Sequence, residues 1–229
     1  MAFFVAIILA LQPDFGQASL VIGSWSIMYF VSGASILILI AIMILMFGFG
    51  TLAYFQSEHV QKRINGFLSP DIEPRTQLDY ATNAIYEGGY FGVGVGEGSV
   101  KWDLPDAHTD FIFSILIEEL GLLTGILIIG MLFGICFRVF LIGRQSLQRR
   151  NHFGFFFCFG AAILIGLHVF INVGVATGLL PTKGLTLPLF SAGGTNILIM
   201  CSMIGLILRI DYENKISMPI ASVKRRVTF

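Results

Sequence analysis

The sequence predicts an all-α fold, a polytopic bundle of membrane-spanning helices with a large extracytoplasmic loop and a re-entrant segment. Of its 229 residues, 55% are hydrophobic and 12% are charged, whereas a soluble domain carries about 25% charged residues. The apolar residues gather in long runs, and a backbone inside lipid must satisfy its own hydrogen bonds, which favours helices. No basic domain is present, so the composition argues against nucleic acid as a partner.

The chain contains six apolar stretches, and we interpret residues 1–229 as a single membrane domain. The stretch Met1–Leu11 is shorter than the roughly 20 residues that a spanning helix needs, and it lacks the basic start and the cleavage site of a signal peptide. We therefore interpret it as the end of a helix. The other five stretches each predict a helix, over Ala18–Gly33, Ser35–Tyr54, Leu120–Leu141, Phe153–Val173 and Phe190–Ile210.

Lysine and arginine predict the orientation, because cytoplasmic loops carry an excess of these residues. One link between apolar stretches contains Arg144, Arg149 and Arg150, and the tail, residues 211–229, contains four more bases. Both segments are therefore predicted to be cytoplasmic, and the two apolar stretches between them keep this assignment consistent. Residues 56–110 then form a large extracytoplasmic loop, with nine acids against four bases.

The two extracytoplasmic loops differ in character. In the first, Leu78–Tyr86 predicts a short helix that the glycine run Gly88–Gly98 should end. This run lacks the spacing and the preceding strand of a nucleotide-binding fingerprint, which leaves a flexible loop or close backbone packing. The second loop, residues 174–188, is apolar, but its Pro and Gly residues forbid a regular helix, so it predicts a re-entrant segment that lines a cavity.

Three titratable residues, Asp106, His108 and Asp110, lie within five positions where the outer loop meets a membrane helix. The dielectric constant falls at this junction, so the pKa of a carboxylate can rise into the range of a general base. Asp110 also directly precedes an apolar helix and has the residue type of an N-cap. From the residues alone the N-cap is favoured, because caps are common and catalytic acids are rare.

Other charged residues have a functional and a structural interpretation. Glu118 and Glu119 lie two turns further along, and carboxylates in a membrane segment are usually functional; Glu118 is alternatively the partner of an arginine on a neighbouring helix. Arg63 and Lys183 suit a pyrophosphate or an anchor at the membrane interface. Asp14 lies between Pro13 and Gly16, a pattern that favours a turn.

The cysteines form no ligand cluster, so no metal site is predicted, and a divalent cation is the one cofactor left open.

Two groups of motifs resemble the SEDS family, the proteins of shape, elongation, division and sporulation. The first group runs from Leu104 to Phe113 and continues in Glu118–Gly121. The second joins Asn172–Gly174 to Gly178–Pro188 and Ser191–Gly194. Because several separated motifs occur in the family's order, the resemblance is specific.

The resemblance extends from Met1 to about Arg209, and Ala107 together with Pro181–Thr186 favours the division branch (FtsW-type) over the elongation branch (RodA-type). Two positions depart from the family pattern: Asp106 stands for a glutamate and Ala192 for a tyrosine. The chain resembles only the C-terminal half of the family's membrane domain. We therefore expect a fragment, a misassigned start, or a split or decayed gene.

The resemblance implies a peptidoglycan glycosyltransferase that polymerises lipid II, the undecaprenyl-pyrophosphate-linked disaccharide pentapeptide, by inverting transfer with release of undecaprenyl pyrophosphate. It implies septal synthesis in the bacterial cytoplasmic membrane, among membrane lipid, with a class B penicillin-binding protein transpeptidase and other division proteins. The family's essential aspartate corresponds to Asp110, which reverses the preference for a cap and implies a base that deprotonates the acceptor's 4-hydroxyl. Arg63 and Lys183 would help to hold the pyrophosphate.

The remaining expected substrate-binding residues are Asp106, His108, Glu118 and Ser191. Two alternatives to the polymerase stay open, a lipid II flippase and a non-catalytic truncated scaffold. A flippase needs polar groups across the whole bilayer, whereas the acids named above lie outside or near the outer face. Their distribution favours the polymerase.

Overall fold

The structure is a computed structural model that describes residues 2–12, 15–56, 58, 61, 65, 77–102, 104, 107–180 and 185–216. Within these residues the chain forms helices and turns and no strand, so the all-α prediction is confirmed. The helices are α1 (Ala2–Leu11), α2 (Phe15–Val31), α3 (Ile36–Gln56), α5 (Gln77–Gly88), the short 3₁₀ helix η1 (Val100–Trp102), α6 (Ile112–Leu120), α7 (Leu122–Gln148), α8 (His152–Ala176) and α9 (Gly194–Ile216).

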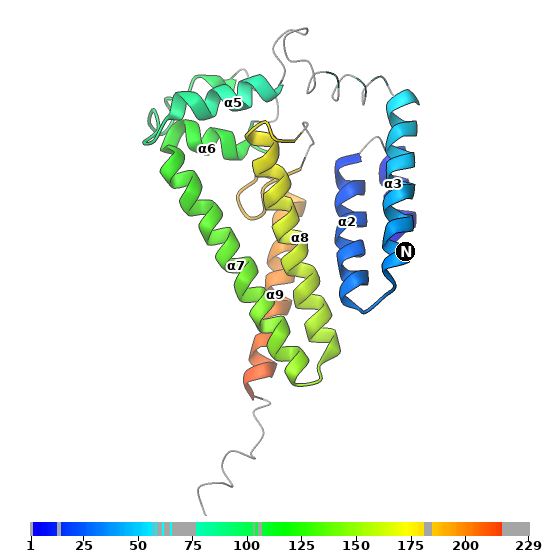
Figure 1. The fold of residues 1–229 in the computed structure, drawn as a ribbon. Coiled ribbons are helices and arrows are strands. Elements are labelled where there is room, and N and C mark those ends of the chain that lie inside the picture. Colours follow the sequence, from blue (N-terminus) through cyan, green and yellow to red (C-terminus); the bar gives the residue numbers. More distant parts are fainter. Residues whose placement is uncertain are drawn as a thin grey trace, which may run out of the picture.

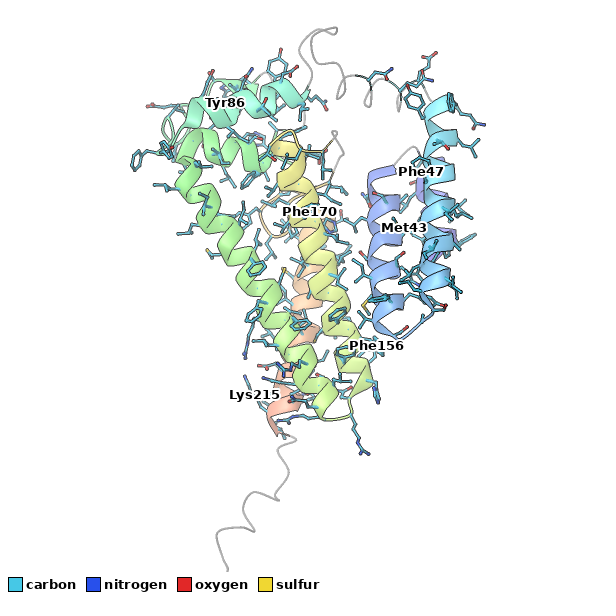
Figure 2. The ribbon with its side chains drawn as sticks, viewed as in Figure 1. Met43, Phe47, Tyr86, Phe156, Phe170 and Lys215 are labelled. Atoms are coloured by element: carbon cyan, nitrogen blue, oxygen red, sulfur yellow. The ribbon has the colours of Figure 1, made fainter. Side chains whose placement is uncertain are left out.

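Four of these helices, α3, α7, α8 and α9, are long and apolar enough to cross a membrane. Their outward surfaces carry apolar side chains: Met43 and Phe47 on α3 are 69% and 77% exposed, and Phe170 on α8 is 67% exposed (Figure 2). Such surfaces are unfavourable in water but suit contact with lipid tails. The helix α2 has 17 residues and stands beside α3 and α8 (Figure 1).

The five longer apolar stretches correspond to α2, α3, α7, α8 and α9, with ends that differ by several residues. Helix α9 continues beyond the predicted end to Ile216, so the predicted cytoplasmic tail of 211–229 begins as helix. Two (i, i+4) ion pairs support this extension, Arg209 with Glu213 at 2.8 Å and Lys215 with Asp211 at 2.6 Å. Such pairs stabilise a helix beyond its apolar part.

At one end of the bundle, α7, α8 and α9 are joined by both apolar and polar contacts. Val139 of α7, Cys158 of α8 and Ile207 of α9 are buried in one cluster. Asn214 of α9 donates from Nδ2 to Ser146 Oγ of α7 at 2.7 Å. The turn between α7 and α8, which contains Arg149 and Arg150 of the predicted basic link, lies at the same end as the end of α9 (Figure 1). This arrangement is the one that the predicted topology requires, while the assignment of this end to the cytoplasm stays a prediction.

At the opposite end, α5 and α6 lie across the tops of α7 and α8 (Figure 1). The predicted short helix of 78–86 is confirmed as α5. A sharp bend at Gly121, which has φ 88°, separates α6 from α7. The glycine run packs its backbone against this bend: the Val93 amide donates to Glu118 O and the Leu122 amide donates to Gly89 O, each at 2.9 Å.

Close backbone packing, one of the two interpretations of the glycine run, is therefore what the structure contains. A Cβ atom at Gly92 would overlap the Glu119 carbonyl, and one at Gly121 would overlap the Tyr90 carbonyl. Both residues also have φ values in the left-handed region, 82° for Gly92 and 88° for Gly121, which favours glycine. The loop is thus a fixed part of the outer cap formed by α5, η1, α6 and residues 89–99.

The segment after α8 turns back into the bundle, as predicted for a re-entrant segment. The amides of Leu179 and Leu180 donate to Gly174 O at 2.8 and 2.9 Å, which reverses the chain just after the helix. Beyond residues 181–184, which lie outside the described part, Leu185 and Leu187 are 3% and 0% exposed. Leu187 packs in one apolar cluster with residues of α6, α7 and α8.

Candidate active site

The turn that contains His108, Thr109 and Asp110 is anchored by apolar residues on both sides. Ala107 and Phe111 are buried in one cluster with Ala81 of α5 and Val175 of α8. His108, between these anchors, is exposed, and Thr109 and Asp110 are partly exposed. The two buried residues that flank the polar ones therefore hold them at this end of the bundle, between α5 and α8.

Three consecutive carbonyl groups of this turn accept hydrogen bonds from distant parts of the chain. The Ala192 amide donates to His108 O at 3.2 Å, and Ser191 Oγ donates to Thr109 O at 2.5 Å. Asn172 Nδ2 donates to Asp110 O at 2.9 Å. The donors come from α8 and from the segment before α9, so the two sequence motifs meet here. We call this arrangement the three-carbonyl anchor.

The N-cap interpretation of Asp110 is wrong. The helix α6 begins at Ile112, Phe111 occupies the N-cap position, and no side-chain cap bond is present there among the described residues. The Phe111 carbonyl accepts from the amides of Ser114 and Ile115, at 3.0 and 3.3 Å. The physical reason is burial: Phe111 is 3% exposed, and its packing fixes the start of the helix one residue later than the polar pattern suggested.

Glu118 is fully buried, and its surroundings differ from the predicted arginine partner. Its Oε1 accepts from the Val100 amide at 2.8 Å, while Oε2 has no hydrogen-bond partner among the described residues. A Cβ atom at Gly98 would lie 2.8 Å from Glu118 Cδ, so the loop closes directly over the carboxylate. Among the described residues no arginine pairs with Glu118, and its carboxylate holds the backbone of η1 instead. The predicted substrate contact of Glu118 stays a prediction.

Glu119, the next residue, holds the same segment through Lys101. Lys101 Nζ lies 2.6 Å from Glu119 Oε1 and also donates to Gly96 O at 3.0 Å. The hydrogen bond from Lys101 lowers the pKa of Glu119 below its usual value, against an opposing effect of burial. The two neighbouring carboxylates thus bind η1 to α6, Glu118 through the Val100 amide and Glu119 through Lys101. Lys101 is one of the four bases counted in residues 56–110, and the structure makes it a structural part of the cap.

The other predicted site residues divide between described and undescribed parts of the chain. Ser191 is 1% exposed and takes part in the three-carbonyl anchor; its predicted contact with substrate remains a prediction. Residues Asp14, Arg63, Asp106 and Lys183 lie outside the described residues. Across the described ranges, no three His, Cys, Asp or Glu residues gather as metal ligands, and the divalent cation stays untested.

Asn172 is a site residue that the sequence argument did not select. It is 2% exposed near the end of α8, where its amide reaches both outer loops. The sequence did contain a signal for Asn172, because it is an amide within an apolar stretch. A polar group buried among apolar residues needs hydrogen-bond partners. The site therefore consists of a half-buried carboxylate-bearing turn, held by its backbone, beside a re-entrant segment.

Comparison with known proteins assigns the family. Residues 1–216 match the family of cell cycle proteins that comprises FtsW, RodA and SpoVE. The chain belongs to this family. The predicted SEDS membership is confirmed, and with four apolar helices the protein is a multi-pass membrane protein.

Similar proteins support the division branch. The chain is 42% identical over 216 residues to a protein of Marinomonas mediterranea, and 39% identical to proteins of Francisella salina and Coxiella burnetii; all three are named probable peptidoglycan glycosyltransferase FtsW. The matches cover 91–93% of this chain but 53–57% of the relatives, so the chain spans about half the length of those proteins. The FtsW-type resemblance is thereby confirmed.

A solved structure has the same fold. It belongs to a study of the coordination of polymerization and crosslinking by a peptidoglycan synthase complex. The TM-score is 0.75 at 27% sequence identity, and the match covers 93% of this chain and 60% of that one. The arrangement of helices described above is therefore shared with a protein chain of that solved complex.

Proposed function

We propose that the protein is a peptidoglycan glycosyltransferase that polymerises lipid II outside the cytoplasmic membrane, with Asp110 as the general base. The three-carbonyl anchor is the observation that carries this proposal. It holds the backbone of His108, Thr109 and Asp110 at the outer end of the bundle while the side chains of this turn remain partly exposed. A general base needs this combination of fixed position and access to substrate.

In the proposed reaction, Asp110 accepts the proton of the acceptor's 4-hydroxyl group. The acceptor oxygen then forms a bond to the anomeric carbon of the donor from the opposite side, which inverts that carbon. The bond from this carbon to the pyrophosphate oxygen breaks, and undecaprenyl pyrophosphate leaves with the bonding electrons. The leaving group gains negative charge, so nearby cations lower the barrier.

Lys183 and Arg63 are the proposed cations for the pyrophosphate. The described residues that flank 181–184 lie beside the Asp110 turn: Leu180 packs on the apolar cluster of Ala107 and Phe111, and the Leu185 carbonyl shares a donor with Asp110 O. A charge-assisted contact between a lysine or arginine and phosphate is stronger than a neutral hydrogen bond. His108, Asp106 and Ser191 complete the proposed substrate site.

The proposal extends to partners and location. A class B penicillin-binding protein and other division proteins at the septum are the proposed partners, within bacterial membrane lipid. The names of the relatives and the fold shared with a subunit of a peptidoglycan synthase complex support this part. Because the chain spans about half the length of its relatives, activity is proposed for the full-length protein.

The polymerisation itself is tested with purified full-length protein, its transpeptidase partner and labelled lipid II. We expect glycan polymer on a gel, and no extension when the acceptor is a 4-deoxy analogue that lacks the attacking hydroxyl. Translocation of lipid II across vesicle membranes without polymer would replace the proposal by a flippase. Absence of both activities, with the partner still bound, would indicate a scaffold.

A further inference from the structure

Asn172 joins the two outer loops through a single nitrogen atom. Its Nδ2 donates to Asp110 O at 2.9 Å and to Leu185 O at 2.7 Å. Asp110 belongs to the turn before α6 and Leu185 to the re-entrant segment. We propose that Asn172 is a positioning residue that sets the distance between the Asp110 turn and the re-entrant segment. Its catalytic consequence rests on the proposed function, whereas its geometric consequence does not.

The chemistry of the contact requires an amide. Both acceptors are backbone carbonyls, so the side chain must supply two N–H donors from one atom, which the amide of asparagine does. Its Oδ1 is buried without a hydrogen-bond partner among the described residues, so the donors are the part of the group that is used. A leucine of similar size keeps the volume but leaves both carbonyls without these donors.

The position of Asn172 differs from that of the other anchoring residues. Ser191 and Ala192 hold the turn from the short segment between the second loop and α9. Asn172 holds the Asp110 turn from helix α8. The same nitrogen also donates to the Leu185 carbonyl of the re-entrant segment. The segment 181–184, between Leu180 and Leu185, contains the proposed pyrophosphate cation. Asn172 therefore holds the turn of the proposed base and the re-entrant segment at Leu185 against the same helix.

A matched control exists at the other end of the same bundle. Asn214 is 3% exposed, and its Nδ2 also donates to two acceptors, Ser146 Oγ at 2.7 Å and Ile142 O at 3.3 Å. It connects α9 to α7 far from the outer loops. Asn172→Leu and Asn214→Leu thus remove equivalent contacts from a buried amide. If the contacts only stabilise the fold, both variants should behave alike.

The test has two readouts, one geometric and one kinetic. For the first, His108→Cys and Ala192→Cys are introduced together after the three native cysteines are replaced by alanine; both residues are exposed and their backbones are bonded. We expect efficient disulfide cross-linking with Asn172 or with Asn214→Leu, and a clear loss of yield with Asn172→Leu. For the second, we expect Asn172→Leu to lower kcat by about 10²-fold with KM little changed, the effect of a small misplacement of a reacting group.

The outcomes separate the inference from the proposed function. The positioning role would be overturned if cross-linking is unchanged in Asn172→Leu. It would also be overturned if Asn172→Leu and Asn214→Leu lose kcat equally while they cross-link equally. If Asn172→Leu does not fold, Asn172→Ser, whose hydroxyl is too short for either carbonyl, takes its place under the same criteria. If the unmodified protein forms no polymer, the proposed function fails, and the cross-linking yield still decides whether Asn172 positions the loops.

Discussion

Lys101 and Glu119 form a largely enclosed ion pair in the outer cap, with 2.6 Å between Nζ and Oε1 and side-chain exposures of 11% and 18%. The pair holds η1 against α6, and Lys101 also holds the glycine run through its hydrogen bond to Gly96 O. Its hydrogen bond is the main cause of the lowered pKa of Glu119. Because the pKa of this carboxyl group is lower in the folded than in the unfolded state, the pair stabilises the fold above the usual glutamate pKa.

We predict that this stabilisation is lost as the pH falls through the lowered pKa of Glu119. In thermal unfolding between about pH 6 and about pH 3, below the usual glutamate pKa, Tm should fall more in the unmodified protein than in Glu119→Gln. At neutral pH, Glu119→Gln should destabilise the protein by roughly 1 kcal/mol, as expected for one ion pair. Glu97→Gln, at an exposed acid of the same cap, serves as the control. Parallel pH profiles for Glu119→Gln and the unmodified protein would contradict the role of the pair.

Glu118 is predicted to act through its hydrogen bond to the Val100 amide rather than through its charge. Glu118→Gln retains an acceptor for this amide, so it should fold and keep most of the polymerisation activity. Glu118→Ala removes the acceptor and leaves the buried Val100 amide without this partner, so we expect a loss of about 1–3 kcal/mol in unfolding free energy. Thermal and denaturant unfolding of both variants would measure this. Equal losses of activity in Gln and Ala variants that remain folded would instead favour a substrate contact that requires the charge.

The predicted topology is tested by cysteine labelling in a background without native cysteines. We expect Asp71→Cys, in the first outer loop, to react with a membrane-impermeant thiol reagent added from outside. Gln148→Cys, at the end of α7, should react only after the membrane is opened. The expectation follows from the basic residues beside Gln148, since cytoplasmic links carry an excess of lysine and arginine. Protection at position 71 together with external labelling at position 148 would reverse the orientation.

Arg63 and Lys183 are predicted to bind the pyrophosphate of the donor. Losing one charge-assisted contact of about 1.5–3 kcal/mol corresponds to a roughly 10- to 150-fold weaker apparent affinity. Steady-state polymerisation by Arg63→Ala and Lys183→Ala should therefore show a raised KM for lipid II. Lys62→Ala removes the neighbouring base and should leave KM unchanged. Unaltered KM in both test variants would reject the pyrophosphate role, and an equal change in Lys62→Ala would attribute the effect to general electrostatics.

The sequence predicted those parts of the fold that depend on side-chain type. Long apolar runs identified the helices, and the motif around Asp110 identified the family. The contacts of Asn172 and Glu118 were not accessible in this way, because their partners are backbone groups, the Asp110 and Leu185 carbonyls and the Val100 amide. Backbone groups look the same at every residue, so their pairing emerges only from the packed fold.

The error at Asp110 has a related cause. N-cap propensity is a local preference worth about 1 kcal/mol, whereas burying a phenylalanine ring contributes about 1.5–3 kcal/mol. The packing of Phe111 therefore decides where α6 begins, and Asp110 lies one residue outside the helix cap. This result also sharpens the interpretation of a substitution at this position, because Asp110 does not serve as the N-cap of α6.

Asp110→Asn is predicted to abolish glycan polymerisation while the protein stays folded and inserted. Asparagine has nearly the same shape, and the Asp110 carbonyl that accepts from Asn172 belongs to the backbone, so the three-carbonyl anchor should persist. The amide cannot accept the proton of the attacking hydroxyl, and loss of a general base lowers the rate by about 10²–10⁴-fold. The assay is lipid II polymerisation by the full-length protein with its transpeptidase partner, beside expression level, Tm and partner binding.

Two comparisons make the Asp110→Asn result decisive. Glu97→Gln, a matched loss of one carboxylate charge in the same outer cap, should polymerise normally, because Glu97 lies in the glycine run rather than in the Asp110 turn. The His108→Cys and Ala192→Cys pair, placed in the Asp110→Asn background, should cross-link as efficiently as in the unmodified protein. A folded Asp110→Asn protein with intact cross-linking and no polymer would then have lost only its base. Near-normal polymer from the same protein would remove Asp110 from the reaction and leave the carboxylate without a catalytic role.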